Sequence, residues 1–546
     1  MASDSGKAGD DVEHRESARD TQTESWDPIP DFGEEVLYGR SGLAGIFSSG
    51  PYILTAAFLA PLGGFSFGYD QGVMGVVNVL PQFHAVIPYA ATAFGKGFMT
   101  GMLLLGCFVG CWFYPYVSDR WSRKKALLIS STIFSIGAII QTAAYDYAAL
   151  VAGRAITGIG TGTLALGAPM YISEISPPNL RGTLLVLESV AIVAGVTLSY
   201  WISFACKDLD GDVSWRLPFA LQLPSAIALG ATIQLFPYSP RWLAMKDRYE
   251  ECLESLCRLR KLPASDERVQ REYHGILAES RFQAALQEKR HPGLGGIRLE
   301  IQEWLDVLSK KRWRRTIVGA GVAFFQQLQG VNAFIYYAPT LFENIGQSGE
   351  MSLILSGIFN ALQIVGVIIA FGLIDRLGRR PLAIGGGIGN CICYVIIAAL
   401  VGTYGGRWEQ GHVDAGWACV AMAFLFIIVF GASYSPLGWA LPPEVFPIGL
   451  RSHGVAFSVA VNWISNFTVG IATPPMFDAW GYGTYIFYAC FCGMAAIWAF
   501  FFVPETMNKT LEQIDDAFGD DSGLEEQELM REVFGQVFVH PKNLES

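Results

Sequence analysis

The chain has 546 residues, of which 51% are hydrophobic and 16% charged, and its mean hydropathy is +0.34. This composition is too apolar and too poor in charge for an ordinary soluble globular protein, so most of the chain is expected to contact lipid or other parts of itself. The formal net charge of −11 lies largely in the two tails and gives no reason to expect a nucleic-acid partner.

Residues 1–50 form an acidic tail. This tail has no cleavable secretory signal, and the first long apolar stretch begins only after it. We therefore expect the tail to be cytoplasmic and the first membrane helix to serve as its own insertion signal.

Twelve apolar stretches follow, each near the ~20 residues that a helix needs to span a bilayer. The first six lie at about 52–78, 97–117, 125–144, 148–173, 183–204 and 217–236. The second six lie at about 315–341, 351–374, 381–402, 415–442, 453–476 and 483–503. The predicted fold class is an all-α membrane protein with twelve transmembrane helices.

A charged segment separates the two sets of six stretches. It is dense in Arg, Lys and Glu with helical Leu spacing, as in residues 250–259, which predicts short amphipathic helices packed beneath the bundle. The predicted division of the chain is a tail at 1–50, a six-helix bundle at 51–238, a helical insert at 239–314, a second six-helix bundle at 315–503 and a tail at 504–546.

The distribution of Lys and Arg predicts the orientation. These residues gather in the loops after the second, fourth, eighth and tenth stretches, whereas the opposite loops are nearly free of them. Short positively charged loops stay in the cytoplasm. Both termini are therefore expected to be cytoplasmic, in a multi-pass protein of the plasma membrane.

Two charge motifs occur once in each half and in the same order. The motif at 119–125, which starts Asp-Arg, is echoed at 375–381, and a Glu seven residues before an Arg occurs at Glu174 and Arg181 and again at Glu444 and Arg451. Weak internal symmetry in an apolar chain is typical of transporters built from two six-helix halves, with the substrate site where the halves meet.

Several motifs together resemble the sugar porter family of the major facilitator superfamily, and within it the fungal monosaccharide transporters. They lie at 68–75, 153–154, 237–242, 326–332, 336–339, 444–447 and 504–506. The resemblance covers roughly residues 55 to 515 and implies a fold of two pseudo-symmetric six-helix bundles that moves sugar by alternating access. The chain departs from the family pattern at Ser122, Ser189, Tyr238 and Gln329.

Amide side chains inside the spans are the natural candidates for binding sugar, because each carries a donor and an acceptor that can bridge two hydroxyls without adding charge. Gln326, Gln327 and Asn332 fall within two turns of one helix, and Asn462 and Asn466 are i, i+4 neighbours. The alternative is that they form hydrogen bonds between helices that hold the bundle together.

The resemblance adds further candidates for the substrate site. Trp439 matches the family's tryptophan in the tenth span, and Tyr337 is a weaker aromatic candidate that ordinary packing also explains. Gln363 or Asn360 takes the place of a sugar-binding Asn in the eighth span. Ser189 stands where many relatives have a sugar-binding Gln, so the identity of the sugar stays open.

Ionisable residues at membrane depth are costly and indicate function. Asp70, Arg154 and Glu188 are placed there. Burial favours a neutral carboxyl group and a nearby cation favours the carboxylate, so an Asp70 that meets Arg154 in only one conformation would take up and release a proton during transport. Proton symport is preferred over facilitated diffusion. Glu188 is either a second proton site or a structural residue.

The repeated charges predict a gate at the cytoplasmic side, where ion pairs between the two halves hold the inner side shut. Its predicted members are Asp119, Arg123, Glu174, Arg181, Arg241, Asp375, Arg379, Glu444, Arg451 and Glu505. Tyr238, in place of an acid, is expected to weaken the N-terminal part of this gate. The alternative is that the positive charges only set the topology.

No enzymatic constellation competes with transport. The ten cysteines show neither a disulfide framework nor a metal-ligand spacing, and no cofactor or metal is expected. The expected partners are a small sugar, protons and the lipid bilayer, and the protein is expected to be monomeric. The alternatives are a facilitated-diffusion uniporter, a polyol or quinate porter and, less favoured, a non-transporting sugar sensor, which would be expected to carry a long cytoplasmic signalling tail.

Overall fold

The computed structural model describes residues 61–310, 312–405, 407–408, 412–507, 518 and 522–539, and every regular element in these ranges is a helix. The helices before the insert are α5 (Pro61–Val77), α6 (Pro81–Val86), η1 (Pro88–Ala91), α7 (Ala93–Trp121), α8 (Arg123–Ala143), α9 (Tyr147–Ile175), α10 (Pro178–Cys206), α11 (Val213–Ala220), α12 (Leu223–Thr232) and η2 (Ile233–Leu235). Those of the insert are α13 (Pro240–Met245), α14 (Tyr249–Arg260), α15 (Glu267–Arg290) and α16 (Gly296–Val307).

The helices after the insert are α17 (Trp313–Leu328), α18 (Val331–Asn344), α19 (Gly349–Leu377), α20 (Arg379–Tyr404), α21 (Val413–Ala432), α22 (Tyr434–Val445), η4 (Ile448–Leu450), α23 (Arg451–Trp480), α24 (Gly483–Phe502) and α26 (Ser522–Val539). Ten helical segments of the described chain are long and apolar enough to cross a membrane. The other two predicted crossings are α5, whose predicted start lies outside the described residues, and the pair α17 and α18. The all-helical membrane architecture is confirmed.

The span predicted at 217–236 is interrupted between α11 and α12, and two later predicted spans are broken helices. The prediction of one continuous helix at 315–341 is wrong, because α17 ends at Leu328 and α18 begins at Val331. Between them Gly330 has φ +82°, and a Cβ there would lie 2.6 Å from a ring carbon of Tyr488, so both the backbone and the space favour glycine. The span predicted at 415–442 is likewise interrupted at Ser433.

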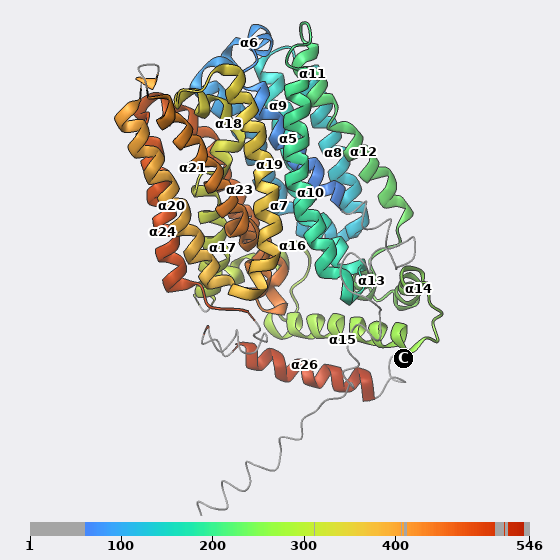
Figure 1. The fold of residues 1–546 in the computed structure, drawn as a ribbon. Helices are drawn as coiled ribbons and strands as arrows, with labels where there is room; N and C mark the ends of the chain where they lie inside the picture. The colour runs from blue at the N-terminus through green and yellow to red at the C-terminus, as the bar shows by residue number, and fades with distance from the viewer. Residues whose placement is uncertain are drawn as a thin grey trace, which may run out of the picture.

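The spanning helices pack as two groups, one before and one after the insert (Figure 1). In the first group α5 packs against α10, and α7 and α8 against α9; in the second α20 packs against α24, and α19 against α21. The groups meet where α7 contacts α23, α10 contacts α19 and α5 contacts α18. We refer to them as the N-half and the C-half.

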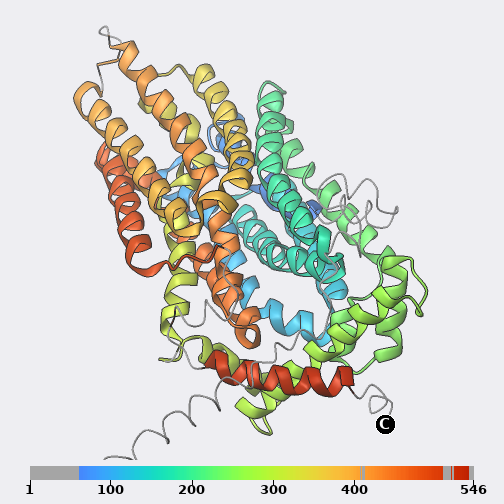
Figure 2. The same ribbon diagram turned by 60° about the horizontal axis from the view of Figure 1, so that its bottom comes forward.

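Two long helices lie across one end of the bundle (Figures 1 and 2). These are α15 of the insert and α26, which pack through Phe282, Leu286 and Val533, and an ion pair joins Arg290 to Glu526. We call this end the insert end and the opposite end, near α6, the far end. The helices α13 to α16 lie within the segment predicted as a helical insert.

Close helix packing in the N-half depends on glycine. At Gly158 of α9, a Cβ would lie 2.0 Å from the backbone oxygen of Leu103 of α7. Small residues allow this approach of two membrane helices. We expect Gly158→Leu to destabilise the protein by about 3 kcal/mol, because the two helices must separate, which a lower melting temperature in detergent would register.

The matched control is Gly385→Leu, since Gly385 is exposed on α20 and a Cβ there meets nothing within 4 Å. Equal melting temperatures for the two variants would contradict this account of the packing.

Candidate functional site

The amide side chains predicted from the sequence lie together at the break between α17 and α18. Gln326 and Gln327 end α17, Asn332 begins α18, and Asn462 faces them from α23; all four are buried. Gln327 Nε2 donates to Asn462 Oδ1 at 2.9 Å, and Asn462 Nδ2 donates to Gln326 Oε1 at 2.6 Å. Asn332 donates to Gln327 Oε1. The break between α17 and α18 therefore lets the amides on either side of it lie together in one polar cluster with Asn462.

This cluster is anchored to a third helix. Gln326 Nε2 donates to the backbone oxygens of Tyr434 and Ser435, at 2.9 and 3.0 Å, where α22 begins. The amides thus satisfy one another and the freed backbone of the second broken span. A hydroxylated ligand could exchange these bonds for its own, because each amide offers both a donor and an acceptor.

Asn360 and Gln363 of α19 are buried at the boundary between the halves. The backbone oxygen of Asn360 accepts a hydrogen bond from Thr197 of α10 at 3.1 Å. Both polar side-chain atoms of Asn360, and Oε1 of Gln363, have no hydrogen-bond partner among the described residues. Buried polar groups are rarely left unpaired, so these atoms suit a ligand or ordered water. Ser189 is half-buried on α10.

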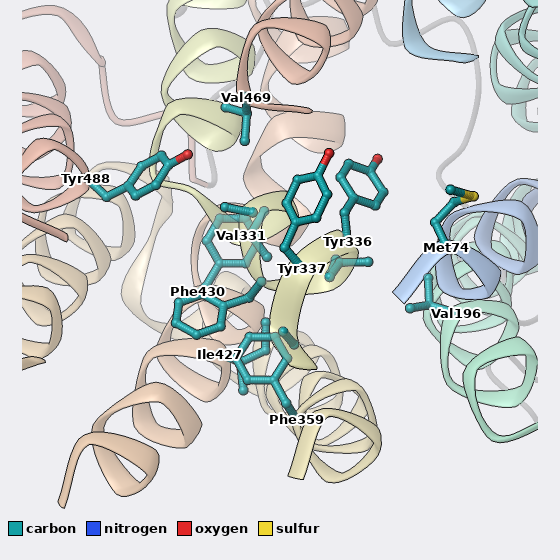
Figure 3. Packing of buried hydrophobic residues seen from close by; sticks show 14 of the residues in the cluster. Met74, Val196, Val331, Tyr336, Tyr337, Phe359, Ile427, Phe430, Val469 and Tyr488 are labelled. Atoms are coloured by element: carbon teal, nitrogen blue, oxygen red, sulfur yellow. The ribbon is translucent and has the colours of Figure 1, made fainter. Parts of the chain in front are cut away.

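The aromatic candidates have different environments. Trp439 is half-buried on α22 and packs against the core, whereas Tyr337 is buried and its hydroxyl donates to the backbone oxygen of Gly470 at 2.7 Å. Figure 3 shows Tyr337 beside Tyr336 on α18, with Met74 of the N-half on the side of Tyr336. The Tyr337 contact is the packing alternative that the sequence left open, while the side chain of Trp439 is partly exposed.

Asp70 and Arg154 form a buried ion pair inside the N-half. Arg154 Nη1 of α9 donates to Asp70 Oδ1 of α5 at 2.8 Å, and both side chains are almost fully buried. The pair is only half satisfied, since Asp70 Oδ2 and the Nε and Nη2 of Arg154 have no hydrogen-bond partner among the described residues. Removing one member of such a pair leaves an uncompensated buried charge.

Glu188 of α10 is a second buried carboxyl group in the N-half. Its side chain lies against α5, where a Cβ built on Gly64 would be 3.1 Å from Glu188 Cγ. It is 5% exposed and forms no ion pair with a described residue. A lone carboxyl group in this setting is costly as a charge.

A polar contact between the halves was not predicted. Gln71 Nε2 of α5 donates to the Tyr336 hydroxyl at 3.1 Å, and Asn78 Nδ2 donates to the Tyr336 backbone oxygen at 3.2 Å. Tyr200 of α10 also donates to the Leu353 backbone oxygen of α19 at 2.8 Å. These bonds join the halves toward the far end. The sequence feature that could have indicated this contact is that Gln71 and Asn78 are amides in an apolar span.

The charges at the insert end form one cluster in each half. In the N-half Arg123 contacts Asp119 at 2.7 Å and Glu174 at 3.0 Å. These are pairs within a half, so pairing between the halves stays a prediction. Tyr238, which replaces an expected acid, packs against Trp242 and has Lys124 Nζ over its ring at 5.4 Å.

The corresponding cluster of the C-half includes a helix cap. Arg379 contacts Glu444 at 3.0 Å. Glu505 accepts hydrogen bonds from the backbone nitrogens of Arg379 and Arg380, at 3.0 and 3.2 Å, where α20 begins. Arg451 is half-buried at the start of α23, and the side chains of Arg181 and Asp375 lie outside the described part of the structure.

Arg241 forms its ion pair inside the insert, so its membership of the gate stays a prediction. Arg241 contacts Glu279 of α15 at 2.8 Å, because the insert folds back and supplies its own acid. The insert also touches both halves through α16. The ring centres of Trp304 and Trp112 of α7 are 4.4 Å apart, and Nε2 of His453 on α23 lies 3.0 Å from a carboxylate oxygen of Glu300. Burial raises the pKa of the neighbouring Glu303 carboxyl, and His453 opposes this shift.

Comparisons with known proteins agree with this architecture. The profile of the sugar (and other) transporter family matches residues 56–518. The sugar transporter STL1 of Saccharomyces cerevisiae is 34% identical over 84% of this chain and 80% of its own, and a high-affinity glucose transporter of Kluyveromyces lactis is 33% identical over 86% and 85%. The proton:xylose symporter XylE of E. coli, bound to a glucose analogue, superposes with a TM-score of 0.69 at 25% identity, over 86% of this chain and 99% of XylE.

Proposed function

Since this chain belongs to the sugar transporter family of the major facilitator superfamily, we propose that it carries a monosaccharide, a hexose or pentose, across the plasma membrane together with a proton. The observation that carries proton coupling is the half-satisfied, buried pair of Asp70 and Arg154. A carboxylate held at this depth by one cation is stable only while that cation stays close. Movement of α9 relative to α5 would then favour protonation of Asp70.

The proposed sugar site lies where the halves meet. Its polar part is the amide cluster of Gln326, Gln327, Asn332 and Asn462, with Asn360 and Gln363 contributing the unpaired amide atoms of α19. Trp439 would cover the apolar C–H face of the sugar ring. Ser189 lies on α10 of the N-half, and Tyr337 supports the site through its bond to α23. The glucose and xylose transporters among the similar proteins favour a monosaccharide.

The proposed cycle alternates between contacts at the two ends of the bundle. The bonds of Gln71, Asn78 and Tyr200 across the halves would hold the far end closed. The insert end is proposed to be cytoplasmic. It would close when the charge cluster around Arg123 in the N-half meets the one around Arg379 in the C-half. A sugar and a proton then shift the equilibrium by binding one conformation more tightly. Glu188 is proposed as a second proton site.

The test of this function is uptake of labelled glucose and xylose in yeast that lacks its own hexose transporters, with the external pH recorded. Symport predicts that adding sugar makes the medium more alkaline and that a protonophore abolishes accumulation. Uptake that ignores the protonophore and leaves the pH unchanged would make the protein a facilitator. If neither sugar enters, polyols and quinate are the next substrates to test.

The insert-end clusters carry a prediction of their own. We expect Arg379→Gln to lower the maximal rate of uptake several-fold with little change in KM, because the lost contact with Glu444 biases the conformational equilibrium and does not touch the sugar. Uptake kinetics at matched surface expression would measure it. Arg314→Gln, an exposed arginine at the start of α17, is the control, and equal rates in both variants would exclude the gate.

A further inference from the structure

An apolar groove lies on the outer surface of the C-half between α20 and α24. It has a volume of about 500 Å³, and its lining is almost entirely apolar, with Ile388, Ile392 and Val395 from α20 and Ile497 and Phe501 from α24. All five of these side chains are exposed. In a protein that spans the bilayer, an exposed apolar hollow between two spanning helices faces lipid.

The length of the groove matches one leaflet. Its lining residues on α20 run from Ile384 to Ile396, which corresponds to about 18 Å along a helix. The hydrocarbon half-thickness of a bilayer is about 15 Å. Because α20 begins at the insert end, with Arg379, the groove starts in the leaflet on the side of the insert and reaches the middle of the helix.

A cation stands at the insert end of this groove. Arg380 precedes Ile384 by one turn, its Nη2 donates to the backbone oxygen of Phe500 at 2.7 Å, and its guanidinium lies 5.4 Å from the centre of the Phe500 ring, which lines the groove. Its Nε is buried and has no hydrogen-bond partner among the described residues, and none of them forms an ion pair with it.

The acid that contacts the start of α20 already has hydrogen-bond partners. Glu505 uses Oε1 and Oε2 to accept the backbone N–H groups of Arg379 and Arg380 at the start of α20. The guanidinium of Arg380 therefore keeps N–H groups that could donate hydrogen bonds to a phosphate. Arginine is well suited to bind phosphate.

We propose that this groove is a binding site for an acidic phospholipid of the leaflet on the insert side. The phosphate of the headgroup would accept hydrogen bonds from Arg380, and one acyl chain would lie along the isoleucines of α20. A neutral sterol would fill the groove but leave the guanidinium without an anion, so the charge favours a phospholipid. The site concerns the lipid-facing surface and is independent of the substrate carried.

The test is native mass spectrometry of the purified full-length protein with phosphatidylserine or phosphatidylcholine added in detergent. The wild type is expected to retain phosphatidylserine preferentially. Arg380→Gln should reduce that preference about fivefold, which corresponds to one basic residue near a membrane surface. Arg314→Gln, which removes an exposed charge at the same end, should leave it unchanged.

A second variant tests the groove itself and does not depend on Arg380. Ile392→Trp should fill the hollow and reduce retention of both lipids, whereas Ile139→Trp on α8 of the N-half should not, although both isoleucines are 54% exposed. An unchanged phosphatidylserine preference in Arg380→Gln, or equal losses in each variant and its control, would overturn the proposal. A shift from dimer to monomer in Ile392→Trp would also overturn it, since the occupant would then be a second copy of the chain.

Discussion

Asp70→Asn is expected to abolish accumulation of sugar against a gradient while exchange of sugar across the membrane continues. Asparagine keeps the size of the side chain and can still accept a hydrogen bond from Arg154, which lies 2.8 Å from Asp70, but it carries no proton to deliver. Sugar binding and the conformational change do not require the carboxylate in the proposed scheme. Of the transport steps, only the link between proton movement and sugar movement is lost, although the uncompensated charge of Arg154 should lower the stability of the protein.

The measurement compares protonophore-sensitive accumulation with counterflow exchange in the same vesicles. The control is Asp208→Asn, since Asp208 is exposed in a far-end loop where it pairs with Lys207, and it should behave as the wild type. Loss of exchange together with accumulation would instead mean that Asp70 is a structural partner of Arg154. If sugar still makes the medium alkaline in Asp70→Asn, another group must carry the coupled proton, and Glu188 is the first candidate.

Hydropathy predicted the helical architecture well because lipid leaves the backbone few options. Every buried N–H and C=O in hydrocarbon must be paired within the protein, so long apolar stretches become helices. The break at Gly330 was not predicted, since a glycine is common in membrane helices. What requires it is the ring of Tyr488, 158 residues away in the chain, and such a contact leaves no local pattern.

The candidate site was predictable to the extent that polar residues are rare in apolar spans. Scarcity alone pointed to Asp70 and Arg154 and to the amides that meet at the broken helix. The hydrogen-bond partners of these groups were harder to predict, because a single sequence does not say which faces of distant helices meet. The bond from Gln71 to Tyr336 was missed for this reason, and so was the ion pair of Arg241 with Glu279, which the fold of the insert brings beside it.

Gln327→Ala is expected to weaken sugar binding about 10- to 100-fold. Gln327 is the central member of the amide cluster, since it donates to Asn462 and accepts from Asn332. Its loss removes its own bonds to the sugar and leaves two buried amides short of a partner, and each such defect costs about 1–3 kcal/mol. The expected change is in KM and in the equilibrium affinity, with a smaller effect on the maximal rate.

Loss of affinity alone could also follow from a disturbed fold, so the decisive comparison uses sugars that lack one hydroxyl group. A site that hydrogen-bonds a hydroxyl rejects the analogue without it, and the deoxy sugar that loses the bond to Gln327 should bind the wild type weakly but bind Gln327→Ala no worse than the full sugar does. Gln141→Ala is the matched control, because Gln141 is likewise a buried amide and donates to Thr157 within the N-half. That variant should keep the wild-type ranking of deoxy sugars even if it is less stable. If Gln327→Ala also keeps the ranking, the amide cluster holds helices together and the sugar binds elsewhere.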